Sequence, residues 1–272
     1  MTITYEHTLT RPKLAVWKFA SCDGCQLTLL NCEDELIPLA GAVEIAYFPE
    51  ATRAVVEGPY DVSLVEGSIT TPDELERIQR VREVSRRVIT IGACATSGGI
   101  QALRNGTDLA AHIRNVYPTP EYVEALVDSQ PIAEFVPVDL ELTGCPVDRG
   151  QLLAALAWLL QGSVPRPPTT PVCIECKKRG YVCVVVAKGE PCLGPVTRTG
   201  CGAICPRMGR GCYGCFGPSQ PPNTEALAKK FIELGMRPTR VADTFRFITG
   251  YAPAFREAAE RLERAEREEM TT

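Results

Sequence analysis

The chain has 272 residues and a net charge of −4, from 29 Lys and Arg against 33 Asp and Glu. This balance excludes the basic footprint of a nucleic-acid-binding protein, and no apolar run approaches the ~20 residues that a transmembrane helix needs. Hydrophobic residues account for 45% of the chain, enough to build the core of one large domain and a smaller one.

Strand and helix patterns alternate over residues 1–162. The predicted strands are residues 13–20, 43–48, 61–68, 88–94 and 135–138, and the predicted helices are residues 25–39, 72–87 and 148–160. The start of the second helix is the clearest, because Thr71 is a good N-cap, followed by Pro72 and then Glu74. Strands separated by helices indicate a parallel sheet with helices on both faces. Since no G-x-G-x-x-G motif follows the first strand, we predict an α/β fold with a flavodoxin-like strand order.

Two further segments follow this α/β domain. A proline-rich linker, residues 162–171, leads into residues 172–218, a module so rich in Cys and Gly that it cannot form a large apolar core. We predict that bound metal stabilises this ferredoxin-like module. Residues 219–272 form a helical extension with helices at residues 224–234 and 252–269, the second of which is highly charged and is expected to face solvent or another subunit.

Twelve of the thirteen cysteines fall into sets of four, the number of thiolates that a [4Fe–4S] cluster binds. Members of the first set follow the carboxyl ends of predicted strands, where parallel sheets bind their ligands, so the fold should bring them together. This first set is Cys22, Cys25, Cys94 and Cys145. The other eight lie in the second module: Cys173, Cys176, Cys183, Cys192, Cys201, Cys205, Cys212 and Cys215.

Disulfides and structural zinc are the competing interpretations of so many cysteines. Disulfides form in oxidising compartments, whereas the N-terminus shows no apolar signal segment and no twin-arginine pair, so we expect a cytoplasmic protein. Zinc also binds four thiolates, often through C-x-x-C pairs. Cys-Pro pairs at residues 145–146 and 205–206 resemble those that close bacterial iron–sulfur motifs. They favour clusters and leave a zinc-stabilised scaffold open.

Residues beside the cysteines are further candidates for the site. Four glycines are predicted to let the backbone approach cluster sulfides and to donate N–H groups to them: they are Gly67, Gly92, Gly98 and Gly99. Glu66 follows a predicted strand, where it either caps or hydrogen-bonds a loop, or else helps to move protons or orients the subunit interface. Cys32, the thirteenth cysteine, is predicted to be a small core residue. The basic run at residues 177–179 is either a solvated loop or a surface that attracts an acidic electron partner.

Four motifs occur in an order that resembles a known family. They are C-D-G-C, V-E-G-S-I, G-A-C-A-T-S-G-G and G-C-P. In this order they resemble the small, electron-transferring subunit of [NiFe] hydrogenases. The second module is similar to that of cytosolic members, above all the NAD(P)-linked sulfhydrogenase delta subunit type. The resemblance covers residues 14–218.

The resemblance implies three [4Fe–4S] clusters and a place for each cysteine. The first set would hold the cluster proximal to the NiFe centre. The distal cluster would be held by Cys173, Cys176, Cys183 and Cys192. The medial cluster would be held by Cys201, Cys205, Cys212 and Cys215. The residues alone leave this split open, because a cysteine from one run often completes another cluster.

The implied function is electron transfer within an H2:NAD(P)+ oxidoreductase. The NiFe site would lie in a separate large subunit, and electrons would pass to flavin/NAD(P)-binding and ferredoxin-like diaphorase subunits. Cys173 and Cys205 stand where uptake hydrogenases have His and Pro, and the added thiolates favour low potentials that suit a nicotinamide. The alternative is a complex-I-like or formate-linked electron-transfer subunit without a NiFe partner, although relatives of complex I carry adjacent cysteines where this chain has C-D-G-C.

Overall fold

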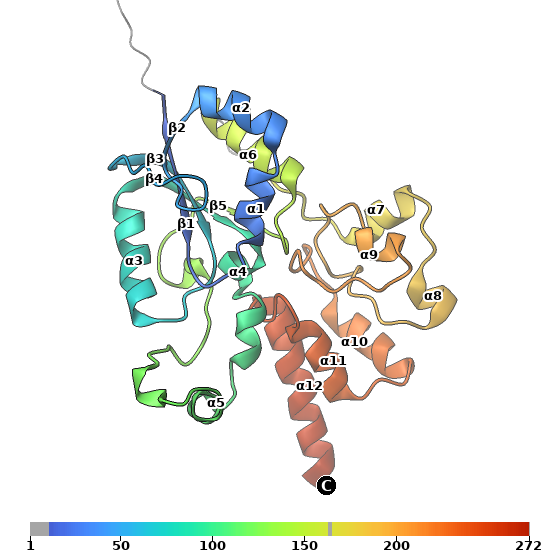
Figure 1. The fold of residues 1–272 in the computed structure, drawn as a ribbon. Coiled ribbons are helices and arrows are strands. Elements are labelled where there is room, and N and C mark those ends of the chain that lie inside the picture. Colours follow the sequence, from blue (N-terminus) through green and yellow to red (C-terminus); the bar gives the residue numbers. More distant parts are fainter. Residues whose placement is uncertain (1–10, 163–164, 272) are drawn as a thin grey trace, which may run out of the picture.

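The structure is a computed structural model that describes residues 11–162 and 165–271, so part of the predicted α/β domain and linker lies outside the described residues. Within these ranges one parallel sheet is formed by β1 (Lys13–Lys18), β2 (Glu44–Tyr47), β3 (Tyr60–Glu66), β4 (Ser85–Ile91) and β5 (Leu140–Leu142). The strands lie in the order β2-β1-β3-β4-β5 (Figure 1). This is the flavodoxin-like order, so the predicted fold class is confirmed.

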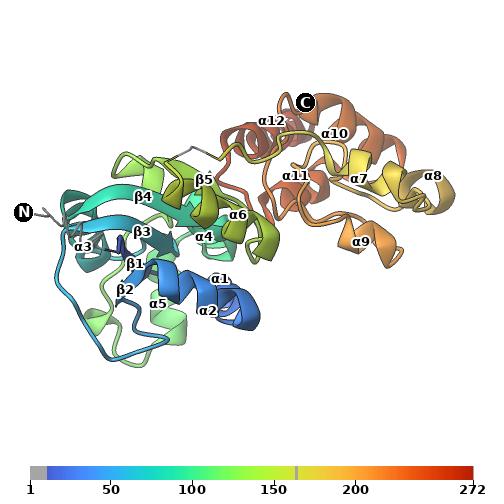
Figure 2. The ribbon, with the colours of Figure 1, turned by 90° about the horizontal axis from the view of Figure 1, so that it is seen from above.

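Helices cover both faces of the sheet (Figure 2). α1 (Gly24–Leu30) and α6 (Arg149–Leu160) pack on one face, and α3 (Pro72–Glu83) packs on the other. Neighbouring residues of β3 show the division, because Leu64 packs under α1 and α6 while Val65 packs under α3. This alternation follows from the two-residue period of a strand.

The segment predicted as one helix at residues 25–39 is two helices, α1 and α2 (Glu33–Ala42). The break falls at Asn31 and Cys32. Cys32 is fully buried there, and its thiol donates a hydrogen bond to the carbonyl oxygen of Thr28 at 3.2 Å. It is a small core residue, as predicted.

The helix predicted at residues 72–87 is α3, which ends four residues earlier than expected. The residues that follow belong to β4, where Ser85 pairs with Tyr60 of β3. Pairing with a neighbouring strand therefore overrides the helical propensity of this segment. The start of the helix is as predicted, because the Glu74 N–H donates to Thr71 Oγ1 at 3.2 Å.

The strands next to the last crossover also differ from the prediction. Residues 135–138 do not form a strand, and β5 begins at Leu140, two residues after the end of the predicted segment. Pro137 lies in the predicted segment and has no N–H to donate to a ladder. β4 ends at Ile91, so Cys94 does not end a strand but lies in the short helix α4 (Gly92–Ser97).

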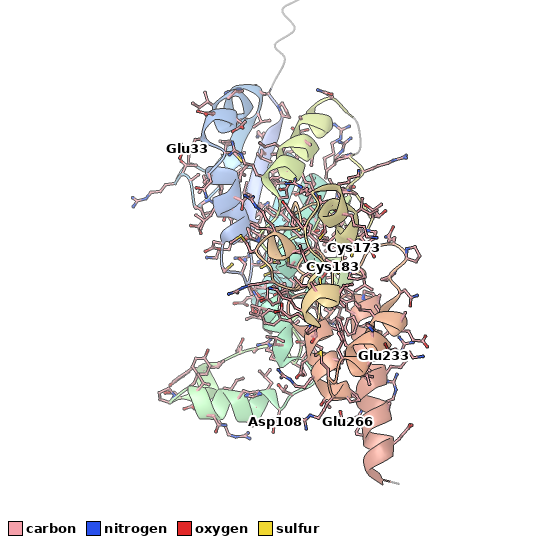
Figure 3. All side chains as sticks on the ribbon, turned by 90° about the vertical axis from the view of Figure 1, so that its right-hand side faces the viewer. Glu33, Asp108, Cys173, Cys183, Glu233 and Glu266 are labelled. Atoms are coloured by element: carbon pink, nitrogen blue, oxygen red, sulfur yellow. The ribbon has the colours of Figure 1, made fainter. Side chains whose placement is uncertain are left out.

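A long connection leads from α4 to β5. It contains η1 (Ile100–Arg104), α5 (Leu109–Val116), η2 (Pro120–Tyr122) and η3 (Ile132–Glu134). These elements were not predicted, since their patterns are short. α5 projects from the body of the molecule, as Figure 3 shows beside the label of Asp108.

The cysteine-rich segment contains three short helices, α7 (Val172–Lys178), α8 (Val184–Lys188) and α9 (Ile204–Arg207). Three longer helices follow: α10 (Thr224–Glu233), α11 (Pro238–Arg246) and α12 (Pro253–Thr271). Phe231, Phe245 and Phe255, one from each, share a buried core with Leu193 and Val196 of the cysteine-rich segment.

The C-terminal helices differ from the prediction in two ways. α11 was not predicted, and α12 packs its apolar face against α11 within the chain. The bundle therefore supports the cysteine-rich segment from one side (Figure 1). None of the helices in the described residues has both the length and the apolar character needed to cross a membrane.

Candidate metal centres

The first set of cysteines meets at the carboxyl edge of the sheet, although its members are up to 123 residues apart. Cys22 and Cys25 follow β1, Cys94 follows β4, and Cys145 follows β5. The thiols of Cys25, Cys94 and Cys145 interact electrostatically with one another, and the last two also interact with Cys22. The parallel topology thus gathers four thiols in one place.

Burial differs among these four thiols and controls their protonation. Cys25 is buried and Cys94 is half-buried, whereas Cys22 and Cys145 are exposed. Burial raises the pKa of the Cys25 thiol, which the nearby Glu66 raises further, and burial raises the pKa of Cys94 to about 11. Because iron binds the thiolate, loading this site must release protons.

Glu66 holds the first cysteine pair in position from the neighbouring strand. Its carboxylate is 2% exposed and accepts hydrogen bonds from the backbone N–H groups of Cys25 at 2.9 Å and Gln26 at 3.2 Å. These are unpaired donors at the start of α1, where a negative charge is favourable. The capping role considered for Glu66 is therefore the one that the geometry supports.

Two of the four candidate glycines lie directly against thiols. A Cβ atom on Gly92, where φ is +86°, would lie 2.3 Å from Cys25 Sγ. A Cβ on Gly99 would lie 2.5 Å from Cys94 Sγ. Only glycine leaves this space free while accepting a positive φ.

The other two candidate glycines have different neighbours from those predicted. A Cβ on Gly67 would meet the backbone of Phe19 at 2.5 Å, so this glycine allows the ends of β1 and β3 to approach each other. Gly98 packs against Ala102, Ser129 and Tyr251 and not against a cysteine.

Gln101 is a site residue that the sequence patterns did not reveal. Its Oε1 lies 3.5 Å from Cys94 Sγ, and its amide Nε2 donates to the Ala20 carbonyl oxygen at 2.6 Å. Gln101 thereby links the loop before Cys22 to the helix of Cys94. No local signal marks a glutamine seven residues after a cysteine as a neighbour of that cysteine.

A second group of thiols gathers around α7 and α8. Cys173 interacts electrostatically with Cys176, Cys183 and Cys192, and Cys176 also interacts with the last two. Cys173 and Cys176 lie three residues apart on α7 and so share one face of it. Burial raises the pKa of Cys173 to about 11. Figure 3 labels Cys173 and Cys183 on this outer part of the molecule.

A third group lies between the other two. Cys215 interacts electrostatically with Cys201 and Cys205, which also interact with each other, and Cys212 interacts with Cys215. Burial raises the pKa of Cys215 to about 12. The burial of Cys212 also raises its pKa.

The three groups lie next to one another. The backbone N–H of Cys145, in the first group, is near the thiol of Cys215 in the third and lowers the pKa of that thiol. The backbone N–H of Cys212, in the third group, donates to Cys192 Sγ of the second at 3.1 Å. The groups therefore form a series with the third in the middle.

All thirteen cysteines lie within the described residues and are free thiols. The described residues contain no three His, Cys, Asp or Glu side chains close enough together to hold a single metal ion.

The surface over the second group is basic and partly apolar. Residues 172–218 contain seven Lys and Arg against two Glu, a local charge of +5 in a chain whose net charge is −4. Lys177 and Lys178 are exposed at the end of α7, and Lys177 interacts electrostatically with Cys173 of the second group. Cys183 of the same group is itself exposed. Val186 of α8 is 86% exposed. We call the exposed surface of residues 174–188 the α7–α8 surface.

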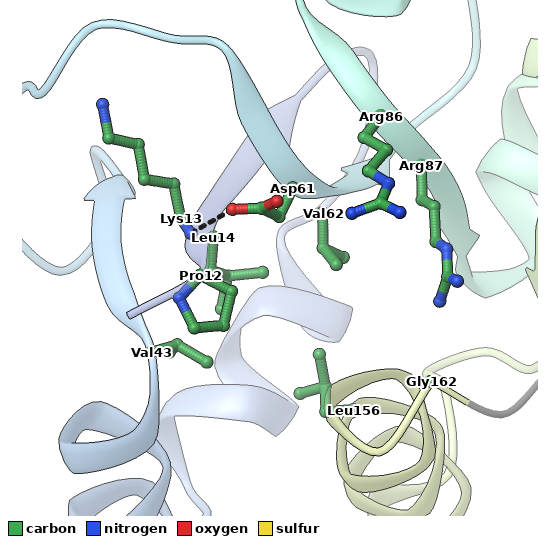
Figure 4. A pocket seen from close by; sticks show the side chains of 10 residues that line it. All are labelled: Pro12, Lys13, Leu14, Val43, Asp61, Val62, Arg86, Arg87, Leu156 and Gly162. Carbon is green, nitrogen blue, oxygen red and sulfur yellow. Dashed lines mark hydrogen bonds between the residues drawn. The ribbon is translucent and has the colours of Figure 1, made fainter. Parts of the chain in front are cut away.

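A cavity of about 270 Å³ lies at the opposite, amino edge of the sheet. Figure 4 shows Lys13, Asp61, Arg86 and Arg87 around it, with the Lys13 backbone N–H donating to Asp61 at 2.9 Å. It is formed by the first residues of the strands, whereas the cysteines follow their last residues. This cavity is separate from the thiol groups.

Comparison with known proteins gives several matches. The family model described as NADH ubiquinone oxidoreductase, 20 Kd subunit, matches residues 22–159. Sulfhydrogenase 2 subunit delta of Pyrococcus furiosus is 38% identical over 222 residues, covering 82% of this chain and 93% of that protein. A subunit of the vhu F420-non-reducing hydrogenase of Methanocaldococcus jannaschii is 34% identical over 241 residues, covering 75% and 81%. A chain in the crystal structure of an NAD+-reducing [NiFe]-hydrogenase matches with a TM-score of 0.54 and 27% identity, covering 58% of this chain and 96% of that one.

Proposed function

We propose a function from the premise that this chain belongs to the NADH ubiquinone oxidoreductase 20 Kd subunit family and is a small subunit of a [NiFe] hydrogenase. In this proposal the chain relays electrons through three [4Fe–4S] clusters, between the NiFe site of a separate large subunit and a soluble acceptor subunit. When bound, each cluster takes up and gives back one electron at a time.

The observation that carries the proposal is the continuous series of three thiol groups. The first group would hold the proximal cluster, the group of Cys201, Cys205, Cys212 and Cys215 the medial one, and the remaining four cysteines the distal one. The nearness of the Cys145 backbone to Cys215 and the hydrogen bond from Cys212 to Cys192 support this order.

The donor set fits such clusters in its chemistry. Each group offers four thiols and no other ligand type is needed. Gly92 and Gly99 keep the space beside Cys25 and Cys94 clear of side chains. Gly194 does the same in the outer group, where an added Cβ would lie 3.3 Å from Cys192 Sγ.

The chain's own backbone would stabilise the thiolates once protons leave. The N–H of Val147 donates to Cys25 Sγ at 3.4 Å, and the N–H of Gly214 donates to Cys212 Sγ at 3.5 Å. Such hydrogen bonds favour the charged sulfur and are among the factors that set the potential of a cluster. Burial of these same thiols excludes water from the path.

The α7–α8 surface supports a soluble, acidic electron acceptor. Its exposed lysines and its apolar residue Val186 lie on the helices that carry or follow the second group of thiols, at the far end of the series. We propose a flavin/NAD(P)-linked or ferredoxin-like subunit as this acceptor, and the similarity to an NAD+-reducing [NiFe]-hydrogenase supports a nicotinamide as the final electron acceptor.

The cytoplasm is the compartment that we propose for this chain, because none of its thirteen cysteines is in a disulfide and thiols stay reduced there.

The test is metal analysis of the anaerobically purified complex, with one cysteine variant and a matched control. The wild type should contain roughly 12 irons per chain and matching sulfide. Cys22→Ser should lower this to roughly 8 irons and abolish H2-dependent reduction of the acceptor. Cys32→Ala, which alters the cysteine outside the three groups, should retain roughly 12.

Two results would contradict the proposal. Two or three zinc ions in place of iron would make the module a structural scaffold. Full H2-dependent turnover in Cys22→Ser would show that the first group does not hold the proximal cluster.

A further inference from the structure

One segment of the chain is ordered but has no core of its own. It consists of residues 100–128, which we call the arm, and it includes η1, α5 and η2. All 29 of these residues are described by the structure, and none of them is buried. In Figure 3 the arm projects from the body on the side opposite α12.

Polar contacts at the base hold the arm in shape. Asn105 and Ser129 bond reciprocally, since the Asn105 amide donates to the Ser129 carbonyl oxygen at 2.9 Å and the Ser129 N–H donates to Asn105 Oδ1 at 2.8 Å. Arg104 donates to the Leu126 carbonyl oxygen at 2.9 Å, and the Leu126 N–H donates to the Thr70 carbonyl oxygen at 2.8 Å. These bonds fix both ends of the arm to the sheet domain.

Beyond this base the arm exposes an unusual share of apolar side chains. Tyr122 is 83% exposed, and Val116 of α5 is 70% exposed on the same helix face as the half-buried Leu109 and Ile113. The large apolar residues exposed along the arm are Ile100, Leu103, Val116, Tyr117, Tyr122 and Val127. An eight-residue helix is marginal in water by itself, and apolar groups gathered on a surface mark a site of contact with another protein.

The position of the arm indicates which partner covers it. The arm starts at Ile100, directly after Gly99, which lies against the side chain of Cys94. The second residue of the arm, Gln101, has its Oε1 atom 3.5 Å from Cys94 Sγ. A protein that covers the arm therefore also lies beside the first group of thiols. The α7–α8 surface is at the other end of the thiol series.

The composition of the arm agrees with a permanent partner. It contains two Arg against four Asp and Glu, so it lacks the basic excess of the α7–α8 surface. Permanent interfaces are more apolar than transient ones, and a stable interface uses about 20–30 residues a side. The 29 residues of the arm are enough for one such interface.

We propose that the arm is the docking surface for the [NiFe] large subunit, which covers the apolar side chains of α5 and η2 and thereby lies against the first group of cysteines. This inference rests on the proposed function, because it assigns a surface to the partner named there.

The experiment co-expresses the tagged chain with the [NiFe] large subunit of the same organism and purifies the complex anaerobically. The variant is Val116→Asp combined with Tyr122→Asp, and the control is Ile37→Asp, whose side chain is 75% exposed on α2, outside the arm and the α7–α8 surface. The large subunit recovered per small subunit should fall about tenfold or more in the arm variant, as expected when charges enter the centre of an interface. The control and Tyr122→Phe should match the wild type. Iron per small subunit should be unchanged in all of them.

Each other outcome overturns the inference. Recovery of the large subunit within about twofold of wild type in the arm variant would show that the arm is not the docking surface. Loss of iron in the arm variant would mean that the substitutions disturb the folding of the chain and not an interface with the large subunit. A wild-type chain that binds no [NiFe] subunit would instead refute the proposed function itself.

Discussion

Replacing Gly92 by alanine tests whether the glycines beside the thiols shape the first metal centre. The added Cβ would lie 2.3 Å from Cys25 Sγ, whereas ordinary contacts begin at 3.4 Å, so the sulfur must move by about 1.1 Å. Metal-binding groups have to be held within about 0.5 Å of their productive positions. Cys25 has little room to retreat, because it is buried and its backbone N–H is bonded to Glu66.

Gly106→Ala is the matched control. Gly106 also has a positive φ, +78°, but nothing lies within 4 Å of the Cβ that alanine would add. Both variants therefore share the backbone penalty of about 1–2 kcal/mol for an L-residue in the left-handed region. Only Gly92→Ala also displaces a thiol.

The assay is iron and sulfide per chain in anaerobically purified protein, with the spectrum of the reduced clusters recorded by electron paramagnetic resonance. Gly92→Ala should retain roughly 8 irons and Gly106→Ala roughly 12. The signals of the two outer clusters should be present in both variants. If Gly92→Ala holds as much iron as Gly106→Ala, the steric reasoning is wrong, and Gly92 serves only the backbone turn.

Two further predictions concern the cap of α1 and the α7–α8 surface. Glu66→Ala leaves two buried N–H groups unpaired and should lower the free energy of unfolding by about 2–4 kcal/mol in urea titrations. Glu66→Gln, which keeps one acceptor oxygen, should lose less, and equal losses would argue against the capping role. Lys177→Glu combined with Lys178→Glu should raise the KM for an acidic ferredoxin about tenfold at low salt, with a smaller effect at high salt and no change with methyl viologen. An unchanged KM for the ferredoxin would show that the α7–α8 surface is not where electrons pass to the acceptor.

Local sequence determined much of the fold and the chemistry of the candidate sites. The alternation of strands and helices predicted the sheet, and the capping residues at Thr71 and Glu74 predicted the start of α3. Type and spacing alone singled out the twelve candidate ligand cysteines, which stays a prediction, whereas the predicted burial of Cys32 is confirmed. These features depend on the preferences of short segments or on side-chain chemistry, so they can be read without a structure.

Elements whose conformation depends on distant neighbours were predicted less well. Ser85 is in a strand because it pairs with Tyr60, although its own segment favours a helix. The helices α4, α5 and α11 are too short, or too weakly patterned, for their periodicity to identify them. The outcome in such segments is set by packing, which overrides a weak local preference.

The sequence by itself therefore determined which residues are candidates to bind metal, and only the tertiary structure decided how they are arranged. Glu66 caps a helix that lies 41 residues before it in the chain, Gly92 lies against a thiol 67 residues away, and the Cys145 backbone lies near Cys215 across the boundary between two segments. None of these contacts has a local signature. They arise because a parallel sheet brings the ends of separate strands to one edge, and because the C-terminal helices hold the cysteine-rich segment against that edge.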